Sequence, residues 1–292
     1  MKKEKYMNQN KILITGASGK LGQLVVETLI QKGEKNFIVT TRNPEKLMSL
    51  TKQGIEVRAA DFTDSRTLKE AFRGADRLLL ISTDAIGSRI EQHKNAIVAA
   101  KNAGVQHIIY TSWPDPEKSV AAVSAEHLAT EKLIKESGMK YTILRNYAYA
   151  ENLLMSLPNA LEMGAYYGVA GDGKVAYVTR HDCAQAAVGA LLSNENVNST
   201  LNISGAKAYS YSEVMNLVEE VTGKKVPYID LTEKDFKSAL VKSGLPEQFA
   251  SLLVSFDLSY KNRDLEGIST AFEKLVGKKP TDLKEFLRTA LK

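Results

Sequence analysis

The chain has 292 residues, of which 43% are hydrophobic and 25% are charged, values typical of soluble globular proteins. This composition excludes a wholly disordered, collagen-like or coiled-coil chain, and no stretch reaches the apolar length of about eighteen residues that spans a membrane. The net charge of +5 is dispersed; it does not indicate nucleic-acid binding but would help to attract an anionic cofactor. Because Cys183 is the only cysteine, an internal disulfide and a cysteine-rich zinc site are excluded, and we expect a cytoplasmic protein.

Residues 1–10 form a polar leader that contains Lys2, Lys3 and Lys5. The leader lacks the apolar core of a signal peptide, so we expect a solvated and frayed N-terminus. The first folded element is expected to begin at Lys11.

From there on, short apolar runs alternate with amphipathic segments. The apolar runs predict strands at 11–15, 37–41, 55–58, 77–81, 107–110 and 141–144. The amphipathic segments predict helices directly after the first strand and at 45–53, 65–72, about 90–103 and about 120–137. Apolar strands separated by amphipathic helices are typical of a parallel sheet covered on both faces. We therefore expect a doubly wound, Rossmann-like α/β domain over residues 11–150, with its ligand at the carboxyl ends of the strands.

The pattern changes after about residue 150. Short predicted strands at 175–178, 200–203 and 226–229 mix with predicted helices at 182–192 and 211–222, and from 232 onward the pattern is only helical. We expect residues 151–292 to form a smaller, mostly helical substrate lobe. Residues 205–292 should supply most of this lobe, and segments within 175–204 should continue the sheet.

A glycine-rich turn joins the first predicted strand to the first predicted helix. It reads Gly16-Ala17-Ser18-Gly19-Lys20-Leu21-Gly22, with GxxGxxG spacing. Small residues in such a turn let the backbone approach a pyrophosphate, which rests on the N-terminus of the following helix. The strand–turn–helix context favours this interpretation over a tight turn without a ligand.

The end of the second strand indicates which dinucleotide binds. About twenty residues after the glycine motif, NAD-binding proteins place an acidic residue for the ribose hydroxyls; here the sequence reads Thr40-Thr41-Arg42-Asn43 and has no carboxylate. A guanidinium is permanently charged and can bind a 2′-phosphate through two parallel hydrogen bonds. We therefore predict NADP(H) in preference to NAD(H). The alternative is that Arg42 is a solvated charge beside a helix.

Three further strand ends are expected to contact the cofactor. The residues at these ends are Asp61, Phe62, Ile81, Ser82, Thr83 and Thr111. The adenine should rest near Asp61 and Phe62, and the nicotinamide half should lie beside residues 81–83. Asp61 can equally be interpreted as part of the N-cap region of the next helix.

Several segments spread over nearly the whole chain carry a family resemblance. They are 12–22, 41–43, 107–112, 127–131, 141–146, 149–152, 171–174, 178–182 and 201–204. These segments resemble the NmrA-like branch of the atypical short-chain dehydrogenases, which includes the type 2 NAD(P)H:quinone oxidoreductases and triphenylmethane reductase. The resemblance implies an NADPH-dependent oxidoreductase that transfers hydride to a small aromatic acceptor, such as a quinone or a similar flat electrophile.

Most short-chain dehydrogenases use a Tyr-xxx-Lys pair, in which the tyrosine supplies a proton and the lysine holds the nicotinamide ribose. Aligned on Glu131, the resemblance places Val123 at the tyrosine position and His127 at the lysine position. Since valine donates no proton, carbonyl reduction is disfavoured, whereas hydride transfer to a quinone needs no strong general acid. His127 would then hydrogen-bond the ribose; a histidine packed on a helix is the alternative.

An aromatic wall for the acceptor is expected after the fifth and sixth strands. Trp113 lies in a proline-bounded loop, and Tyr147 and Tyr149 follow the sixth strand; core packing is the alternative for the two tyrosines. Asn146 resembles the site asparagine of the family and would hold an acceptor oxygen. Asn146 and His127 are therefore the candidate catalytic residues.

Two other functions stay open. A non-catalytic regulator that senses NADP(H) and binds a protein partner is favoured by Val123 and disfavoured by the aromatic wall. A sugar-nucleotide epimerase shares the fold but requires the missing tyrosine. Four scattered histidines predict no metal site. We expect a monomer or homodimer that binds neither nucleic acid nor membranes.

Overall fold

The computed structural model describes residues 10–292. The predicted frayed leader, with Lys2, Lys3 and Lys5, therefore lies outside the described residues except for Asn10. The chain divides into two compact units, which we call unit 1 and unit 2. Unit 1 comprises residues up to Thr111 together with 129–143 and 187–199, and unit 2 comprises 112–128, 144–186 and 200–292. Within residues 10–292, no helix has both the length and the apolar character required to cross a membrane.

The main sheet has the predicted doubly wound topology. Its strands are β1 (Ile12–Ile14), β2 (Phe37–Thr41), β3 (Glu56–Ala59), β4 (Arg77–Leu80), β5 (His107–Ser112), β6 (Lys140–Asn146) and β9 (Ser199–Ile203). They are ordered β3-β2-β1-β4-β5-β6-β9, and β1 pairs in parallel with both β2 and β4. The strand order thus reverses between β1 and β4, which is where such sheets bind dinucleotides.

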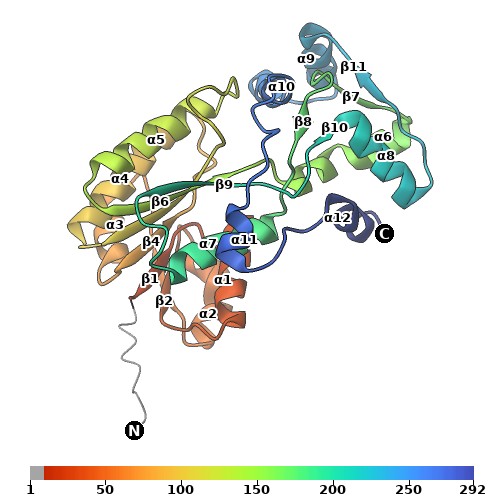
Figure 1. Ribbon diagram of the computed structural model, residues 1–292. Helices are drawn as coiled ribbons and strands as arrows, with labels where there is room; N and C mark the ends of the chain where they lie inside the picture. The colour runs from red at the N-terminus through yellow and green to blue at the C-terminus, as the bar shows by residue number, and fades with distance from the viewer. Residues whose placement is uncertain (1–9) are drawn as a thin grey trace. The chain divides into compact units, whose positions relative to one another are not determined.

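Helices cover both faces of the sheet in unit 1 (Figure 1). They are α1 (Lys20–Gln31), η1 (Pro44–Leu47), α2 (Met48–Lys52), α3 (Ser65–Phe72) and α4 (Arg89–Asn102), joined by parts of α5 (Ser124–Glu136) and α7 (Arg180–Leu192). Both views show α1 and α2 on one face and α3 and α4 on the other. On the second face, paired strand residues such as Leu13, Leu78 and Ile108 pack in one buried cluster with Leu68 and Phe72 of α3.

Two predicted helices start differently in the structure. The predicted helix at 45–53 begins as the short 3₁₀ turn η1, with Pro44 at its start. The helix predicted from about residue 120 begins only at Ser124. Before Ser124, the backbone N–H groups of Val120 and Ala122 donate to the side chains of Asp264 and Ser255, so contacts with the C-terminal region hold this segment.

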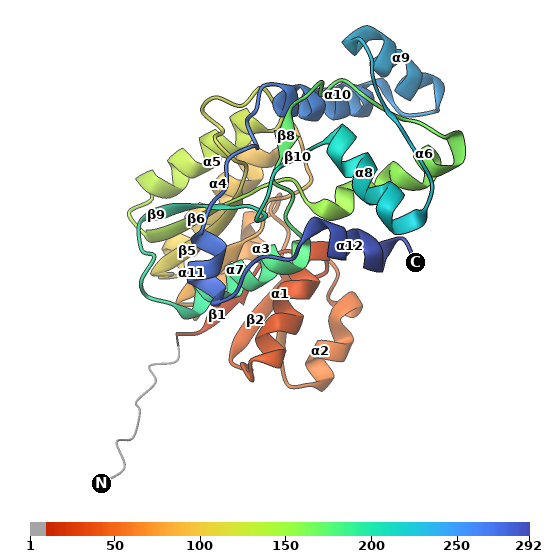
Figure 2. The ribbon, with the colours of Figure 1, turned by 45° about the vertical axis from the view of Figure 1, so that its right-hand side comes forward.

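Unit 2 contains the helical C-terminal region. Its further elements are η2 (Ala150–Met155), α6 (Leu157–Met163), β7 (Tyr166–Gly168), β8 (Lys174–Val175), β10 (Tyr209–Ser210), α8 (Tyr211–Thr222), β11 (Tyr228–Asp230), α9 (Glu233–Lys242), α10 (Glu247–Lys261), α11 (Ala271–Val276) and α12 (Leu283–Ala290). Only helices follow Thr232, as predicted, and Figure 2 shows α8 beside α12. The strand predicted at 175–178 is reduced to the two residues of β8, which pair with β10.

Candidate functional site

The glycine-rich turn has the backbone geometry of a phosphate-binding loop. Gly16 adopts φ +61°, a conformation that favours glycine. A Cβ on Gly22 would lie 2.2 Å from the carbonyl oxygen of Gly16, so the first turn of α1 packs directly against the loop. Gly19 is the N-cap of α1, contributes no side-chain cap, and is followed by no acidic residue in the first turn. The N-terminus of α1 is therefore suited to an anion.

Hydrogen bonds fix this turn to the end of β2. The Ala17 amide donates to the carbonyl oxygen of Thr40 over 3.1 Å, and the hydroxyls of Ser18 and Thr41 lie 3.0 Å apart. The side chains of Ala17 and Leu21 are buried, so these two residues present only backbone groups to a ligand.

Arg42 follows β2 directly and is exposed. It forms no hydrogen bond or ion pair with any residue between 10 and 292. The next residue, Asn43, caps η1 by accepting from the Glu45 amide over 3.1 Å, so Arg42 lies in the bend between β2 and η1 and not within a helix. A guanidinium that is exposed beside an anion-binding loop fits a phosphate group.

Asp61 lies in the turn that leads into α3. Its Oδ1 accepts from the backbone N–H of Thr63 over 2.9 Å and from the Thr63 hydroxyl over 2.7 Å. These bonds lower the pKa of Asp61, and the positive charge of Arg42 lowers it further. The N-cap of α3 is Asp64, whose carboxylate accepts from the Arg66 amide, so the helix-cap interpretation applies to Asp64 and not to Asp61. Phe62 packs partly buried against the core cluster.

Two threonine side chains hold the backbone of the turn after β4. The Ile81 amide donates to Oγ1 of Thr15 over 3.0 Å, and the Ser82 amide donates to Oγ1 of Thr111 over 2.9 Å. The predicted cofactor residue Thr111 is thus engaged in fixing Ser82. The Thr83 hydroxyl is buried and has no partner among the described residues, which is unusual for a buried polar atom and fits a ligand contact.

NADP(H) fits the residues that unit 1 brings together. The glycine turn and the N-terminus of α1 suit a pyrophosphate, and the exposed guanidinium of Arg42 suits a 2′-phosphate. The buried Thr83 hydroxyl, which has no partner among the described residues, could form a hydrogen bond with the ligand. All the cofactor residues predicted from the sequence except His127 lie in this unit.

Unit 2 contains the four predicted acceptor-binding residues. The indole Nε1 of Trp113 donates to the Ser119 hydroxyl over 3.0 Å, and the ring stacks on Phe256 at 5.4 Å between centroids. Tyr147 is buried, and burial raises the pKa of its hydroxyl to about 12. The Arg180 guanidinium lies 4.7 Å from the centre of the Tyr149 ring.

Asn146 is buried at the end of β6. Its Nδ2 donates to the Tyr149 hydroxyl over 3.4 Å, a long hydrogen bond, while its Oδ1 has no partner within residues 10–292. A buried carboxamide with one unpaired end is the kind of group that binds a ligand oxygen or hydroxyl.

Val123 and His127 are both buried. Val123 directly precedes α5, and His127 lies in its first turn.

Cys183 is fully buried, and burial raises the pKa of its thiol well above the usual range. Such a thiol is a poor nucleophile.

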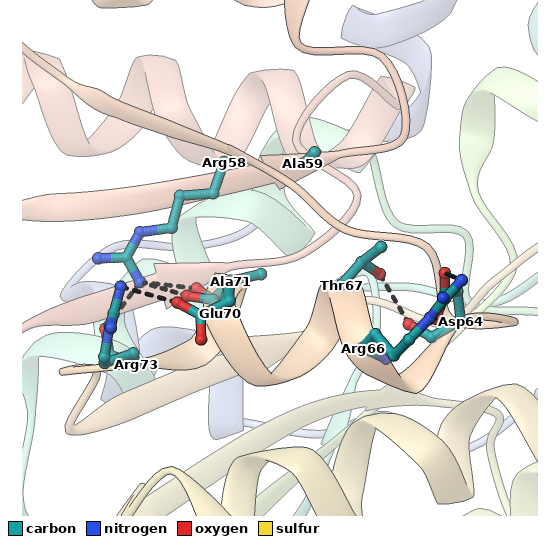
Figure 3. Close-up of a pocket in the computed structure, with 8 residues that line it drawn as sticks. All are labelled: Arg58, Ala59, Asp64, Arg66, Thr67, Glu70, Ala71 and Arg73. Atoms are coloured by element: carbon teal, nitrogen blue, oxygen red, sulfur yellow. Dashed lines mark hydrogen bonds and ion pairs between the residues drawn. The ribbon is translucent and has the colours of Figure 1, made fainter.

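The depression shown in Figure 3 is separate from these groups. It lies between β3 and α3, and none of its lining residues was predicted as a site residue. Nη1 of Arg58 donates to the carbonyl oxygens of Glu70, Ala71 and Arg73. Since these carbonyls close the C-terminal end of α3, Arg58 acts as a helix cap, and we assign the depression a structural role.

Sequence reasoning missed two residues whose side chains accept from backbone amides of the turn after β4. Thr15 follows β1 and directly precedes the glycine turn, a position in the sequence that could have marked it. His93 lies on α4 and accepts from the Thr83 amide over 3.2 Å. No motif or spacing in the sequence marks His93.

The chain is similar to known proteins over nearly its whole length. Residues 8–287 match the model of the NmrA-like family. The chain is 41% identical over 275 residues to quinone oxidoreductase 2 of Escherichia coli strain K12, which covers 94% of this chain and 96% of that protein.

Two solved structures are also similar to the chain. The NADPH-dependent quinone oxidoreductase of Escherichia coli complexed with NADPH matches with a TM-score of 0.93 at 39% identity, covering 96% of this chain and 100% of that one. Triphenylmethane reductase of Citrobacter sp. complexed with NADP(H) gives a TM-score of 0.91 at 35% identity, with coverage of 96% and 100%. The match to the family model and these similarities span nearly the whole chain, and the protein belongs to the NmrA-like family.

Proposed function

We propose that this protein is an NADPH-dependent reductase that passes hydride to a quinone or a similarly flat electrophile. The observation that carries the proposal is the exposed Arg42 beside the glycine turn, which forms no hydrogen bond or ion pair in the described part of the chain. Relatives whose names include NADPH-dependent quinone oxidoreductase and triphenylmethane reductase support the same activity.

Unit 1 would hold the cofactor through both backbone and side-chain groups. The amides of residues 16–22 and the N-terminus of α1 bind the pyrophosphate, Arg42 binds the 2′-phosphate, and Asp61 and Phe62 contact the adenosine. Residues 81–83 contact the nicotinamide half, because it crosses the sheet at the point where the strand order reverses. NADPH, when bound, supplies the hydride. His127 lies in unit 2, and its contact with the ribose stays a prediction.

Unit 2 would supply the groups that bind the acceptor. Trp113, Tyr147 and Tyr149 offer aromatic surface for a flat molecule. The carboxamide of Asn146 orients an acceptor oxygen. The oxygen and nitrogen of an amide are interchangeable by a flip. In the flipped state, Asn146 would accept from Tyr149 and point an N–H at the acceptor.

The proposed acceptor class follows from Val123. This side chain stands where the resemblance places the proton-donating tyrosine, and valine carries no transferable proton. Hydride transfer to a quinone leaves an oxygen anion that is stabilised by the aromatic ring, so protonation by solvent afterwards suffices. An aliphatic ketone would need a general acid at the same position.

The test is oxidation of NADPH by the purified protein with and without 1,4-benzoquinone, run beside NADH. We expect protein-dependent oxidation that requires the quinone and favours NADPH. Asn146→Leu, which keeps the side-chain volume, should lower kcat about tenfold and leave the Kd for NADPH unchanged, because it removes one hydrogen bond to the acceptor.

Other outcomes would redirect the proposal. If NADPH binds but no quinone or cationic dye is reduced, the activity is refuted and the protein is better described as a regulator that senses NADP(H). If NADPH does not bind, the cofactor assignment itself is wrong.

A further inference from the structure

Three consecutive backbone amides at the end of β4 donate to side chains instead of to a neighbouring strand. The first two donate to the hydroxyls of Thr15 and Thr111. The third, from Thr83, donates to Nε2 of His93 over 3.2 Å. His93 lies on α4, so a helix side chain supplies the acceptor for this amide after the strand has ended.

The hydrogen bonds of His93 determine its tautomer. Because the Thr83 amide is a donor, Nε2 must carry the lone pair and accept. The ring proton must then lie on Nδ1, which is 2.9 Å from the Thr130 hydroxyl and donates to it. His93 is therefore a neutral imidazole that joins Thr83 after β4 to Thr130 on α5.

The surroundings keep the imidazole neutral and immobile. His93 is fully buried, and its ring meets that of Tyr110 edge-on, at 5.5 Å between centroids and 77° between planes. Burial lowers the pKa of His93 to about 3, and the nearby positive charge of Arg89 lowers it further. A protonated ring would place an N–H against the Thr83 N–H, so neutrality is a condition for this contact.

Arg89 holds the same peptide from its other side. Its Nε donates to the carbonyl oxygen of Thr83 over 2.8 Å. Two side chains of α4, those of His93 and Arg89, thus bind the backbone N–H and the carbonyl oxygen of Thr83. Only the side-chain hydroxyl, buried and without a partner in residues 10–292, is left for a ligand.

We propose that His93 is a positioning residue, which fixes the Thr83 peptide so that the Thr83 hydroxyl is presented to the nicotinamide half of the cofactor. This inference rests on the proposed function, because it assumes that NADP(H) binds at the reversal of the strand order. His93 itself does not touch the cofactor or the reacting atoms; it acts through Thr83.

Two substitutions separate the two hydrogen bonds of His93. In His93→Gln, the amide oxygen reaches the position of Nε2 and can accept from Thr83. In His93→Asn, the shorter amide reaches only the position of Nδ1 and can donate to Thr130, which leaves the Thr83 amide unpaired. Both variants lose the imidazole ring, so their stabilities should fall by similar amounts, and melting temperatures check this.

The readout is the affinity for NADPH and for adenosine 2′,5′-bisphosphate, which carries the adenosine half and the 2′-phosphate but no nicotinamide. We expect His93→Asn to weaken NADPH about tenfold and to leave the affinity for the bisphosphate unchanged. His93→Gln should restore NADPH affinity to within about threefold of the unmodified protein.

Each contrary outcome has a separate meaning. Equal NADPH affinities for the Asn and Gln variants would overturn the positioning role, and so would a matching loss of bisphosphate affinity in His93→Asn. If the unmodified protein binds the bisphosphate but NADPH no more tightly, Thr83 contacts no nicotinamide and the inference fails. If it binds neither, the proposed function fails first.

Discussion

The cofactor edge of unit 1 and the core of unit 2 hold their buried polar groups in opposite ways. In the turn after β4, three consecutive backbone amides donate to two threonine hydroxyls and a neutral imidazole. None of these changes charge between pH 5 and pH 8. In unit 2, a carboxylate stands at the centre of a cluster of tyrosine rings.

That carboxylate belongs to Asp257 on α10. It accepts from the Val169 amide over 2.9 Å and from the Tyr211 hydroxyl over 2.7 Å, and the Tyr211 ring contacts those of Tyr166 and Tyr228. Burial raises the pKa of Asp257 to about 6, although the two hydrogen bonds act in the opposite direction. Asp257 therefore titrates in the range where the edge of unit 1 does not.

The contrast between neutral groups after β4 and a titrating carboxylate in unit 2 fits different requirements in the two units. A dinucleotide site needs donors and acceptors whose positions and charges are constant, and in unit 1 the three amides after β4 donate to neutral groups. Unit 2 tolerates a group with a variable charge in its core. The following predictions test each side of this comparison, beginning with the largest effect.

The largest effect is expected from Gly22→Ala. The added Cβ would lie 2.2 Å from the Gly16 carbonyl oxygen, so the glycine turn must move away from α1. We expect the Kd for NADPH to rise about 100-fold, because several amide contacts to the pyrophosphate are lost together. Isothermal titration calorimetry measures this. Glu27→Ala, an exposed position on the same helix, is the control and should bind normally; normal binding by Gly22→Ala as well would show that the turn is not preformed.

A second prediction concerns Asp257→Asn and the pH dependence of stability. The folded-state pKa of about 6 lies above the ordinary value of 3.8, so the folded protein binds this proton more tightly than the unfolded chain. The contribution of this group to the free energy of unfolding is then fully present below pH 4 and is lost as the pH rises through 6, by up to about 3 kcal/mol in total.

The asparagine variant lacks this titration. Its amide can still accept from Val169 and donate to the Tyr211 oxygen. The melting temperature of the unmodified protein should therefore fall relative to the variant between pH 4 and pH 6, and then run parallel to it. Parallel curves over the entire range would mean that Asp257 has an ordinary pKa and that the contrast between the units is absent.

The smallest effect is expected from Thr83→Val, which removes a hydroxyl that has no partner in the described structure. Stability should not decrease, because no hydrogen bond is lost, while the Kd for NADPH should rise about tenfold, as in His93→Asn, because both variants lose the same contact of the Thr83 hydroxyl. Thr15→Val is the matched variant: its hydroxyl donates to the Leu79 carbonyl and accepts from the Ile81 amide. Chemical denaturation should show a loss of about 1–3 kcal/mol there. Equal stability losses in both variants would show that the Thr83 hydroxyl is also bonded within the protein.

The parts of the fold that depend on local sequence were predictable. Apolar strands, amphipathic helices and the Gly16–Gly22 turn each follow from residues that are neighbours in the chain, and the doubly wound sheet is confirmed. The start of α5 was not predictable, because Val120 and Ala122 bond to side chains that lie 144 and 133 residues away.

The same distinction applies to the candidate site. Arg42 was identified from its spacing after the glycine motif. His93 was not, because its role depends on Thr83 ten residues before it and Thr130 thirty-seven residues after it. The cap of α3 follows from local sequence: the helix predicted at 65–72 leaves Asp64 directly before its first residue, and Asp64 accepts from the Arg66 amide whereas Asp61 accepts from that of Thr63.

The most direct test of the cofactor assignment is the preference of Arg42→Ala for NADPH over NADH. We predict that kcat/KM for NADPH, with 1,4-benzoquinone as acceptor, falls about 30-fold in the variant because a charge-assisted contact to the 2′-phosphate is lost, while the value for NADH stays unchanged. An Arg42→Ala protein that keeps its preference for NADPH, or loses activity equally with both cofactors, would contradict the account.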